Sequence, residues 1–277
     1  MPTFTIVPTV NDIHSALQEL APDSLAESWD NVGILAGSRR QAVHRVMVAL
    51  DPCVAVANQA AAAACDLIIT HHPAIFRPIR QLAAESPEGP FLLAAIRHNI
   101  SVIACHTSLD SAEHGVNQSL AQGLGLTAIR PLAPASVNPE KCGLGAIGCY
   151  PVPISPEELV SRIVAFCRPP WILAAGQPPK QVGSLALCGG SGSEFAELAL
   201  TLGADAYLTA ELKHNVARWA EEAGLWVLDA GHFPTENPAM PLFAARLREL
   251  FATHHWEIPV DLAAQETPLG LLWPRSV

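Results

Sequence analysis

The sequence contains no run of basic residues and no unbroken apolar segment long enough to span a membrane. Lysine and arginine total 16 against 26 aspartates and glutamates, which gives a formal net charge of −10. A chain without a basic patch lacks the attraction on which nucleic-acid binding depends. The most apolar stretch, residues 54–70, is interrupted by Asn58, Gln59 and Asp66, whereas a transmembrane helix needs about 20 apolar residues. We therefore expect neither nucleic acid nor a membrane as a partner.

Cysteine is used in a way that argues against a disulfide framework. The chain has seven cysteines, an odd number, and none of them forms a C-x-x-C pair. This pattern is typical of reduced thiols. It predicts a cytoplasmic protein.

Two common catalytic motifs are also missing. No G-x-S-x-G occurs, so a serine nucleophile has no support. The stretch Gly189-Gly190-Ser191-Gly192-Ser193 lacks both the lysine of a P-loop and the G-x-G-x-x-G spacing. It lies between a predicted strand and a predicted helix, so it is either a tight turn or an anion site made of backbone N–H groups.

The chain alternates short apolar strands with helical segments. Half of its 277 residues are hydrophobic and 15% are charged, as in globular proteins. Strands are predicted at 45–50, 66–72, 101–105, 144–150, 182–187, 206–209 and 225–228, with helices between them. Strand, helix and strand in this order predict an α/β fold with parallel strands. The proline-rich stretch 131–139 suggests two lobes, one of residues 1–126 plus 231–277 and the other of 127–230.

The two lobes share a plan that suggests an internal duplication. Val48 lies 18 residues before Asp66, and Leu187 lies 18 residues before Asp205; each aspartate lies four residues before a threonine. In both halves a third strand is followed by a histidine and, four residues later, by a carboxylate. A true repeat would place the carboxyl ends of both sets of strands at a ligand site.

Histidines follow three of the predicted strands. Each histidine alone is more often a hydrogen-bonded or surface residue than a metal ligand, but their coincidence with two carboxylates favours a metal site. A returning turn brings residues i and i+4 within about 6 Å. The candidate ligands are His71, His72, His106, Asp110, His232 and Glu236. Six ligands suit two ions with positions left open for water or substrate, and nitrogen and oxygen donors suit Zn, Mn, Fe, Co or Ni.

Three further polar residues follow the predicted strand that ends at Thr209. They are Glu211, Lys213 and His214. Glu211 is the candidate catalytic residue, because a carboxylate beside a metal site can move protons. An ordinary solvated helix start explains these three residues equally well.

Six motifs occur in an order that resembles a known family. They are Trp-Asp-Asn-Val-Gly (29–33), Ile-Thr-His-His-Pro (69–73), His-Thr-Ser-Leu-Asp (106–110), Cys-Gly-Gly-Ser-Gly (188–192), Thr-Ala-Glu-Leu-Lys-His (209–214) and Gly-His-Phe-Pro-Thr-Glu (231–236). Together they resemble the Nif-three-like dinuclear metal centre family, also called GTP cyclohydrolase 1 type 2 homologues. The resemblance implies two related α/β lobes, a toroidal homohexamer, and a two-metal site with the six ligands named above.

The sequence departs from the family pattern in two places. Ala210 stands where many relatives have glycine, and residues 127–181 are too few for the extra domain of longer relatives. The chain therefore resembles the short form of the family.

Two functions remain open from the sequence. The first is a metal-dependent hydrolase acting on a nucleotide, with opening of the GTP ring as one candidate reaction. The alternative is a non-catalytic hexameric metal-binding scaffold or regulatory protein. No motif for guanine recognition is visible.

Overall fold

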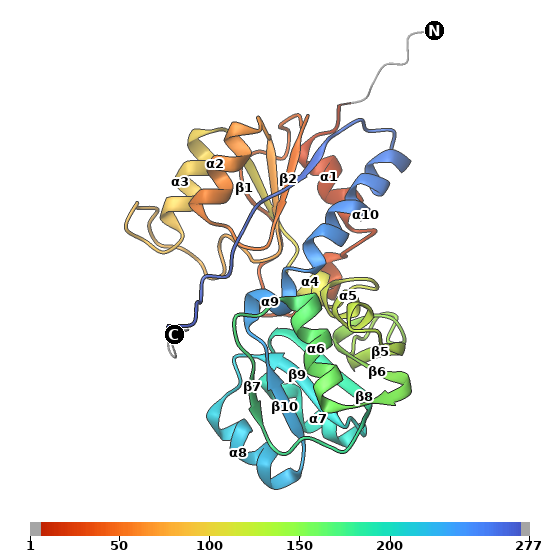
Figure 1. Ribbon diagram of the computed structural model, residues 1–277. Coiled ribbons are helices and arrows are strands. Elements are labelled where there is room, and N and C mark those ends of the chain that lie inside the picture. The colour runs from red at the N-terminus through yellow and green to blue at the C-terminus, as the bar shows by residue number, and fades with distance from the viewer. Residues whose placement is uncertain (1–6, 273–277) are drawn as a thin grey trace. The chain divides into compact units, whose positions relative to one another are not determined.

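The computed structural model describes residues 7–272, which divide into two compact units (Figure 1). The first unit comprises residues up to 109 together with 240–265, and the second comprises 110–239 and the residues from 266 onward. Each unit contains one sheet covered by helices. The predicted α/β fold class is confirmed.

The first unit contains a mostly parallel five-stranded sheet. Its strands, in spatial order, are β1 (Gly33–Ala36), β4 (Ser101–Ala104), β3 (Leu67–Thr70), β2 (Val46–Ala49) and β11 (Val260–Leu262). Only β1 runs antiparallel to its neighbour. Every residue of β2, β3 and β4 is buried, as expected for central strands covered on both faces.

Helices cover both faces of this sheet. The helices are α1 (Val10–Leu17), the 3₁₀ turn η1 (Asp23–Leu25), α2 (Val54–Ala62), α3 (Gly89–Arg97) and α10 (Ala239–Thr253). Figure 1 shows α2 and α3 on one face and α1 and α10 on the other. Thr9 caps α1, because its hydroxyl accepts the N–H of Asp12 while the Asp12 carboxylate accepts the N–H of Thr9.

The second unit contains a six-stranded mixed sheet. Its strands, in spatial order, are β5 (Thr127–Pro134), β6 (Gly143–Ile154), β8 (Val182–Ser191), β9 (Ala206–Ala210), β10 (Trp226–Asp229) and β7 (Leu173–Ala175). Strands β8, β9 and β10 are parallel, and the other three run antiparallel to their neighbours. The sequence did not predict β5 or β7, because both lie in proline-rich stretches; proline is tolerated at a sheet edge, where these strands lie.

Helices also cover both faces of the second sheet. The helices of this unit are α5 (Val116–Gly123), α6 (Pro156–Cys167), the 3₁₀ turn η2 (Ser193–Phe195), α7 (Ala196–Thr201), α8 (His214–Ala223) and α9 (His232–Glu236). Side chains of α5 and α6 pack on one face of the sheet, and those of α7 and α8 on the other. Ser155 caps α6, since its hydroxyl accepts the N–H of Glu158.

The units differ from the predicted lobes in three stretches. The prediction placed residues 110–126, 231–239 and 266–272 in the first lobe, whereas they belong to the second unit. The reason is packing, because α5 lies against β5, β6 and β8, and α9 lies against β8 and β9. The helix α4 (Thr107–Asp110) contains the change from the first unit to the second.

The predicted duplication stays a prediction, although the two sheets share details. The Asp66 carboxylate accepts the N–H of His44 at 2.7 Å, and Asp205 accepts the N–H groups of Gly183 and Ser184 at 2.8 Å. Each aspartate thus holds the start of the preceding strand. The spacing between the third strand and its histidine differs by one residue between the halves. Ala104, which pairs with Thr70, lies two residues before His106, whereas Asp229, which pairs with Thr209, lies three residues before His232.

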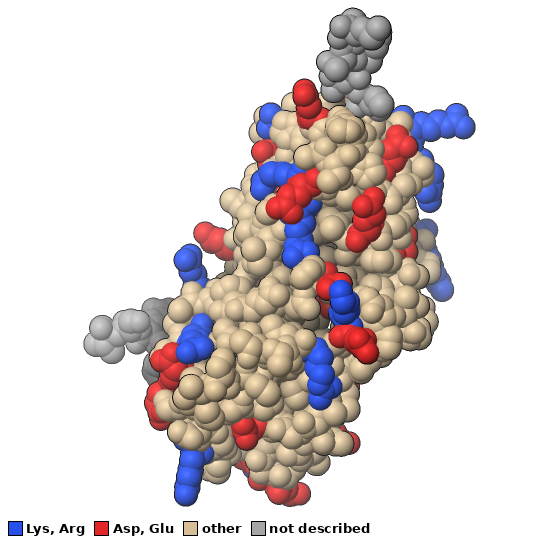
Figure 2. All heavy atoms as spheres, turned by 90° about the vertical axis from the view of Figure 1, so that its right-hand side faces the viewer, with Lys and Arg blue, Asp and Glu red and all other residues tan. Residues whose placement is uncertain are grey.

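The surface carries no large field of one sign on the face drawn in Figure 2. Lysines and arginines lie scattered among acidic side chains there, and most of this face is uncharged. None of the helices in residues 7–272 combines the length and hydropathy needed to cross a bilayer.

Candidate metal centre

Three of the predicted ligands lie at the carboxyl ends of two adjacent strands in the first unit. His71 and His72 follow β3 directly, and His106 lies two residues beyond the end of β4. Because β3 and β4 are parallel neighbours, their carboxyl ends meet at one edge of the sheet. Open α/β sheets bind ligands at this edge.

The three imidazoles form a compact cluster. Ring centroids lie 4.9 Å apart for His71 and His72, 5.2 Å for His71 and His106, and 5.5 Å for His72 and His106. One nitrogen of each ring lies within 4.8 Å of one nitrogen of the others, and the group could hold a metal ion. Three protein ligands with room for a further one are typical of catalytic rather than structural zinc sites.

Each imidazole of this cluster is oriented through its Nδ1. That atom lies 3.1 Å from the carbonyl oxygen of Cys105 in His71, 2.7 Å from Oδ1 of Asp51 in His72, and 2.9 Å from Oδ1 of Asp30 in His106. An Nδ1–H donated to such an acceptor makes Nε2 the nitrogen with the lone pair. Metal-binding histidines commonly have this second contact, which fixes ring orientation and raises ligand basicity.

Asp51 corrects a sequence-based expectation. Its position before the alanine-rich segment predicts a helix cap, but α2 begins after Cys53 and has no side-chain cap. The Asp51 carboxylate instead contacts His72. The same short acidic side chain suits both roles, and only the pairing of β2 with β3 brings Asp51 to His72.

Asp30 is the buried anchor of His106. Its carboxylate accepts the N–H of Thr107 at 3.0 Å and the Thr107 hydroxyl at 2.6 Å, besides contacting His106. Burial raises the pKa of Asp30, but the hydrogen bonds from His106 and Thr107 outweigh burial and hold the pKa below its usual value. Asp30 therefore remains ionised and attracts positive charge toward the histidine cluster.

His232 and Glu236 form a second group in the other unit. The helix α9 places them four residues apart, and Nε2 of His232 lies 3.2 Å from Oε2 of Glu236. Nδ1 of His232 lies 2.9 Å from Oε1 of Glu211. The predicted turn between His232 and Glu236 is thus helical, and Glu211 contacts the imidazole as an orienting carboxylate.

The glycine-rich stretch packs against this group. Gly190 has φ +64°, and a Cβ there would lie 2.1 Å from Oε1 of Glu236. The N–H groups of Gly189, Gly190 and Gly192 are donated to the side chains of Asn117, Thr235 and Thr209, respectively. These amides already have protein acceptors, which argues against the anion site. The predicted tight turn is also wrong for the first three residues, because β8 continues through Gly189, Gly190 and Ser191.

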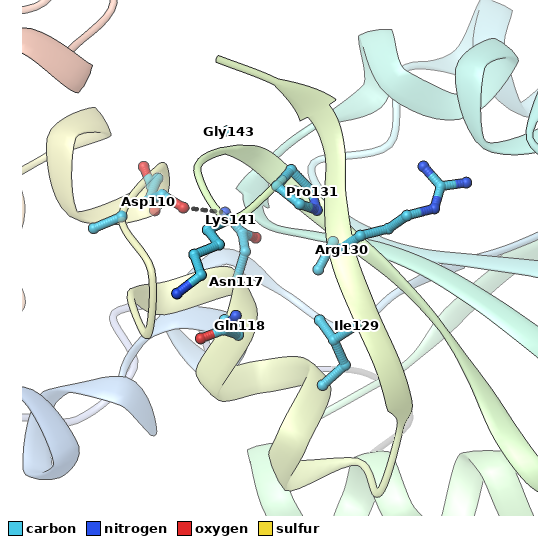
Figure 3. A pocket seen from close by; sticks show the side chains of 11 residues that line it. Asp110, Asn117, Gln118, Ile129, Arg130, Pro131, Lys141 and Gly143 are labelled. Carbon is cyan, nitrogen blue, oxygen red and sulfur yellow. Dashed lines mark hydrogen bonds between the residues drawn. The ribbon is translucent and has the colours of Figure 1, made fainter. Parts of the chain in front are cut away.

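Asp110 ends α4 and begins the second unit. Asn117 donates its side-chain amide to the main-chain oxygen of Asp110 at 3.2 Å (Figure 3). A small pocket beside them is also lined by Arg130 and Lys141 (Figure 3). Lys141 pairs with Glu113 at 2.9 Å, so its charge is already balanced.

Cys188 also lies in the second unit, where its buried side chain packs as an apolar residue. Burial, together with Asp110, Glu236 and Glu194, raises the pKa of this thiol well above its ordinary value. A thiol that stays protonated is a poor ligand. Among residues 7–272, the groups that could hold a metal ion contain histidines and carboxylates and no cysteine. Their donor atoms are nitrogen and oxygen, as the sequence suggested.

Sequence reasoning missed Asp30 and Asp51 as part of the site. Asp30 lies in the motif Trp29-Asp30-Asn31-Val32-Gly33, which alone could be any tight loop. Asp51 lies two residues beyond the end of β2, as His72 lies two residues beyond the end of the neighbouring strand β3, and that shared position was the available signal.

Comparison with known proteins identifies the family of this chain. The family model Duf34/NIF3 (NGG1p interacting factor 3) matches residues 8–268. A Streptomyces coelicolor protein named GTP cyclohydrolase 1 type 2 homolog is 36% identical, over 94% of this chain and 93% of its own. The Schizosaccharomyces pombe protein NIF3 homolog is 31% identical, over 81% and 84%.

Solved structures show the same fold. The Staphylococcus aureus protein SA1388 superposes with a TM-score of 0.91 at 26% identity, over 96% of this chain and all of its own. Since the family model covers nearly the whole sequence, the chain belongs to the Duf34/NIF3 family.

Proposed function

We propose that this protein is a metal-dependent hydrolase that holds two divalent transition-metal ions per chain and acts on a nucleotide. The observation that carries the proposal is the anchoring of the imidazoles. The Nδ1 atoms of His71, His72, His106 and His232 each lie at a backbone or carboxylate oxygen, which makes each Nε2 the donor for a metal.

The proposed ligands are the six predicted from the sequence: His71, His72, His106, Asp110, His232 and Glu236. Their nitrogen and oxygen donors suit Zn, Mn, Fe, Co or Ni. Such ions, when bound, supply electrophilic activation and lower the pKa of water. Asp30, Asp51 and Glu211 orient three of the imidazoles, and Glu211 is also the proposed group for proton transfer.

The proposed substrate and assembly rest on the family. The name of the Streptomyces coelicolor relative makes GTP the first nucleotide to test and ring opening the first reaction. A homohexamer is proposed from the family resemblance alone. A cytoplasmic location is proposed from the seven cysteines, whose odd number and spacing suit a reducing compartment.

The test combines elemental analysis with GTP turnover on the same tag-free samples. We expect about two transition-metal ions per chain in the parent, and a clear loss in His106→Ala and in Glu236→Ala. His98→Ala is the matched control, because His98 is exposed and lies in the same unit as His106. Its metal content should equal that of the parent.

The outcomes separate the two functions. Saturable GTP consumption that disappears in both site variants supports the hydrolase. Metal that binds and exchanges with no turnover of any nucleotide supports the non-catalytic scaffold. A metal content near zero after supplementation, unchanged by either substitution, overturns the metal centre itself.

A further inference from the structure

Two exposed aromatic side chains lie together in the first unit. Trp29 is 57% exposed and Phe76 is 41% exposed. Their ring centroids lie 5.9 Å apart, with the planes inclined at 65°. Scattered apolar side chains are normal on a surface, but two large rings in contact there indicate a surface that binds something.

Both rings flank a candidate metal ligand. The ring centroids of Trp29 and Phe76 each lie 6.2 Å from that of His106, at interplanar angles of 75° and 79°. The three rings are thus steeply inclined to one another. We call Trp29 and Phe76 the aromatic corner.

Hydrogen bonds fix the position of the aromatic corner relative to His106. The side-chain amide of Asn31 donates to the carbonyl oxygen of Ile75 at 2.5 Å, which joins the segment of Trp29 to that of Phe76. Asp30, the neighbour of Trp29, contacts His106 at 2.9 Å. The rings are therefore positioned by the same segment that orients the ligand, as in a preorganised binding site.

We propose that the aromatic corner binds the planar heteroaromatic ring of the substrate and positions it beside the ligand His106. The inference rests on the proposed function, and it specifies which residues recognise the substrate. A heteroaromatic ring can stack on one of these side chains and present its edge to the other, which inclined rings favour. Stacking needs no hydrogen-bond motif, which explains why the sequence shows no motif for base recognition.

The test measures binding rather than turnover. Equilibrium dialysis with metal-loaded protein compares GTP with inorganic triphosphate, which carries the phosphates without the ring. Trp29→Leu and Phe76→Leu should each weaken GTP binding by about tenfold, because base stacking contributes about 1–3 kcal/mol. Affinity for triphosphate and metal content should not change.

Two further variants serve as controls. Trp29→Phe restores an aromatic ring and should recover most of the GTP affinity that Trp29→Leu loses. Trp256→Leu removes a tryptophan that stacks on His254 with a centroid distance of 4.7 Å. It should bind GTP as the parent does.

The outcomes distinguish this inference from the proposed hydrolysis. If the parent binds GTP without converting it and the leucine variants lose this binding, the role of the aromatic corner is supported. The same result contradicts the proposed hydrolase. Unchanged GTP affinity in both leucine variants overturns the inference even where the parent turns GTP over. Equal loss for triphosphate, or a change of oligomeric state measured by light scattering with GTP affinity intact, overturns it as well.

Discussion

The carboxylate of Glu211 lies 2.9 Å from Nδ1 of His232, and this contact sets which nitrogen of His232 faces Glu236. Glu211 makes the contact from a left-handed backbone conformation, with φ +54°. Such a conformation costs a non-glycine residue about 1–3 kcal/mol, and it is concentrated at functional sites. A glutamate at position 211 is therefore explained by its side-chain contact with His232 and not by its backbone conformation.

Glu211→Gly separates metal retention from stability. Glycine relieves the left-handed strain but enlarges the conformational freedom of the unfolded chain, so the two effects on stability nearly cancel. The lost carboxylate leaves His232 unoriented, and loss of such a contact lowers metal affinity by about 10–100-fold. We expect a thermal midpoint close to that of the parent, with metal lost at a lower chelator concentration.

Two other substitutions are controls for the metal loss expected in Glu211→Gly. Glu211→Gln keeps an oxygen acceptor for His232 and should retain most of the metal affinity. His255→Gly changes another left-handed residue, with φ +58°, and should leave metal binding alone. Equal metal affinity in Glu211→Gly and the parent would show that Glu211 does not orient a ligand.

The candidate ligands were proposed from local signals. Buried strands that end just before His71 and His106, and the four-residue spacing from His232 to Glu236, are visible in short windows of sequence. The structure brings His71, His72 and His106 together in the first unit, and it places His232 beside Glu236 in the second. Their role as metal ligands stays a prediction.

The anchors Asp30 and Asp51 were missed because their contacts depend on which segments pair in the fold. Asp51 reaches His72 only because β2 and β3 are neighbours in parallel register, 21 residues apart in the chain. Asp30 reaches His106 across 76 residues. Periodicity within a segment carries no information about such partners. The edge strands β5 and β7 were missed because β5 contains two prolines and β7 is only three residues long, with prolines on both sides of it in the sequence.

Asp30→Asn should change how stability depends on pH. The pKa of Asp30 is lowered in the folded protein, so its contribution is fully present above the unfolded-state pKa of about 3.9. That contribution is lost as the pH falls from there through the folded-state pKa. At pH 7 we expect Asp30→Asn to lower the free energy of unfolding by about 2 kcal/mol, because Asn replaces a charged acceptor of three hydrogen bonds.

The measurement is urea unfolding of metal-stripped parent and variant at pH 7 and at about pH 3. Removing the metal keeps changes in metal affinity out of the comparison. The difference between the two proteins should shrink at the acidic pH, where the Asp30 carboxyl of the parent is mostly protonated in the unfolded state. An equal difference at both pH values would show that the Asp30 charge does not stabilise the fold.

Gly190→Ala tests the close packing of the glycine-rich end of β8 on Glu236. The new Cβ would lie 2.1 Å from Oε1 of Glu236 and 3.0 Å from Nε2 of His232, so the carboxylate has to move. The backbone also disfavours alanine, since φ is +64°. We expect a loss of stability of about 1–3 kcal/mol, together with a marked loss of bound metal.

Gly224→Ala isolates the backbone part of that effect. Gly224 has φ +77°, and a Cβ there would meet no atom within 4 Å. It should lose stability by about 1 kcal/mol and keep the metal content of the parent, because only the conformational cost applies. Thermal unfolding gives the stability of both variants, and elemental analysis gives their metal content. If Gly190→Ala keeps its metal as well as Gly224→Ala does, the position of the Glu236 carboxylate does not control metal binding.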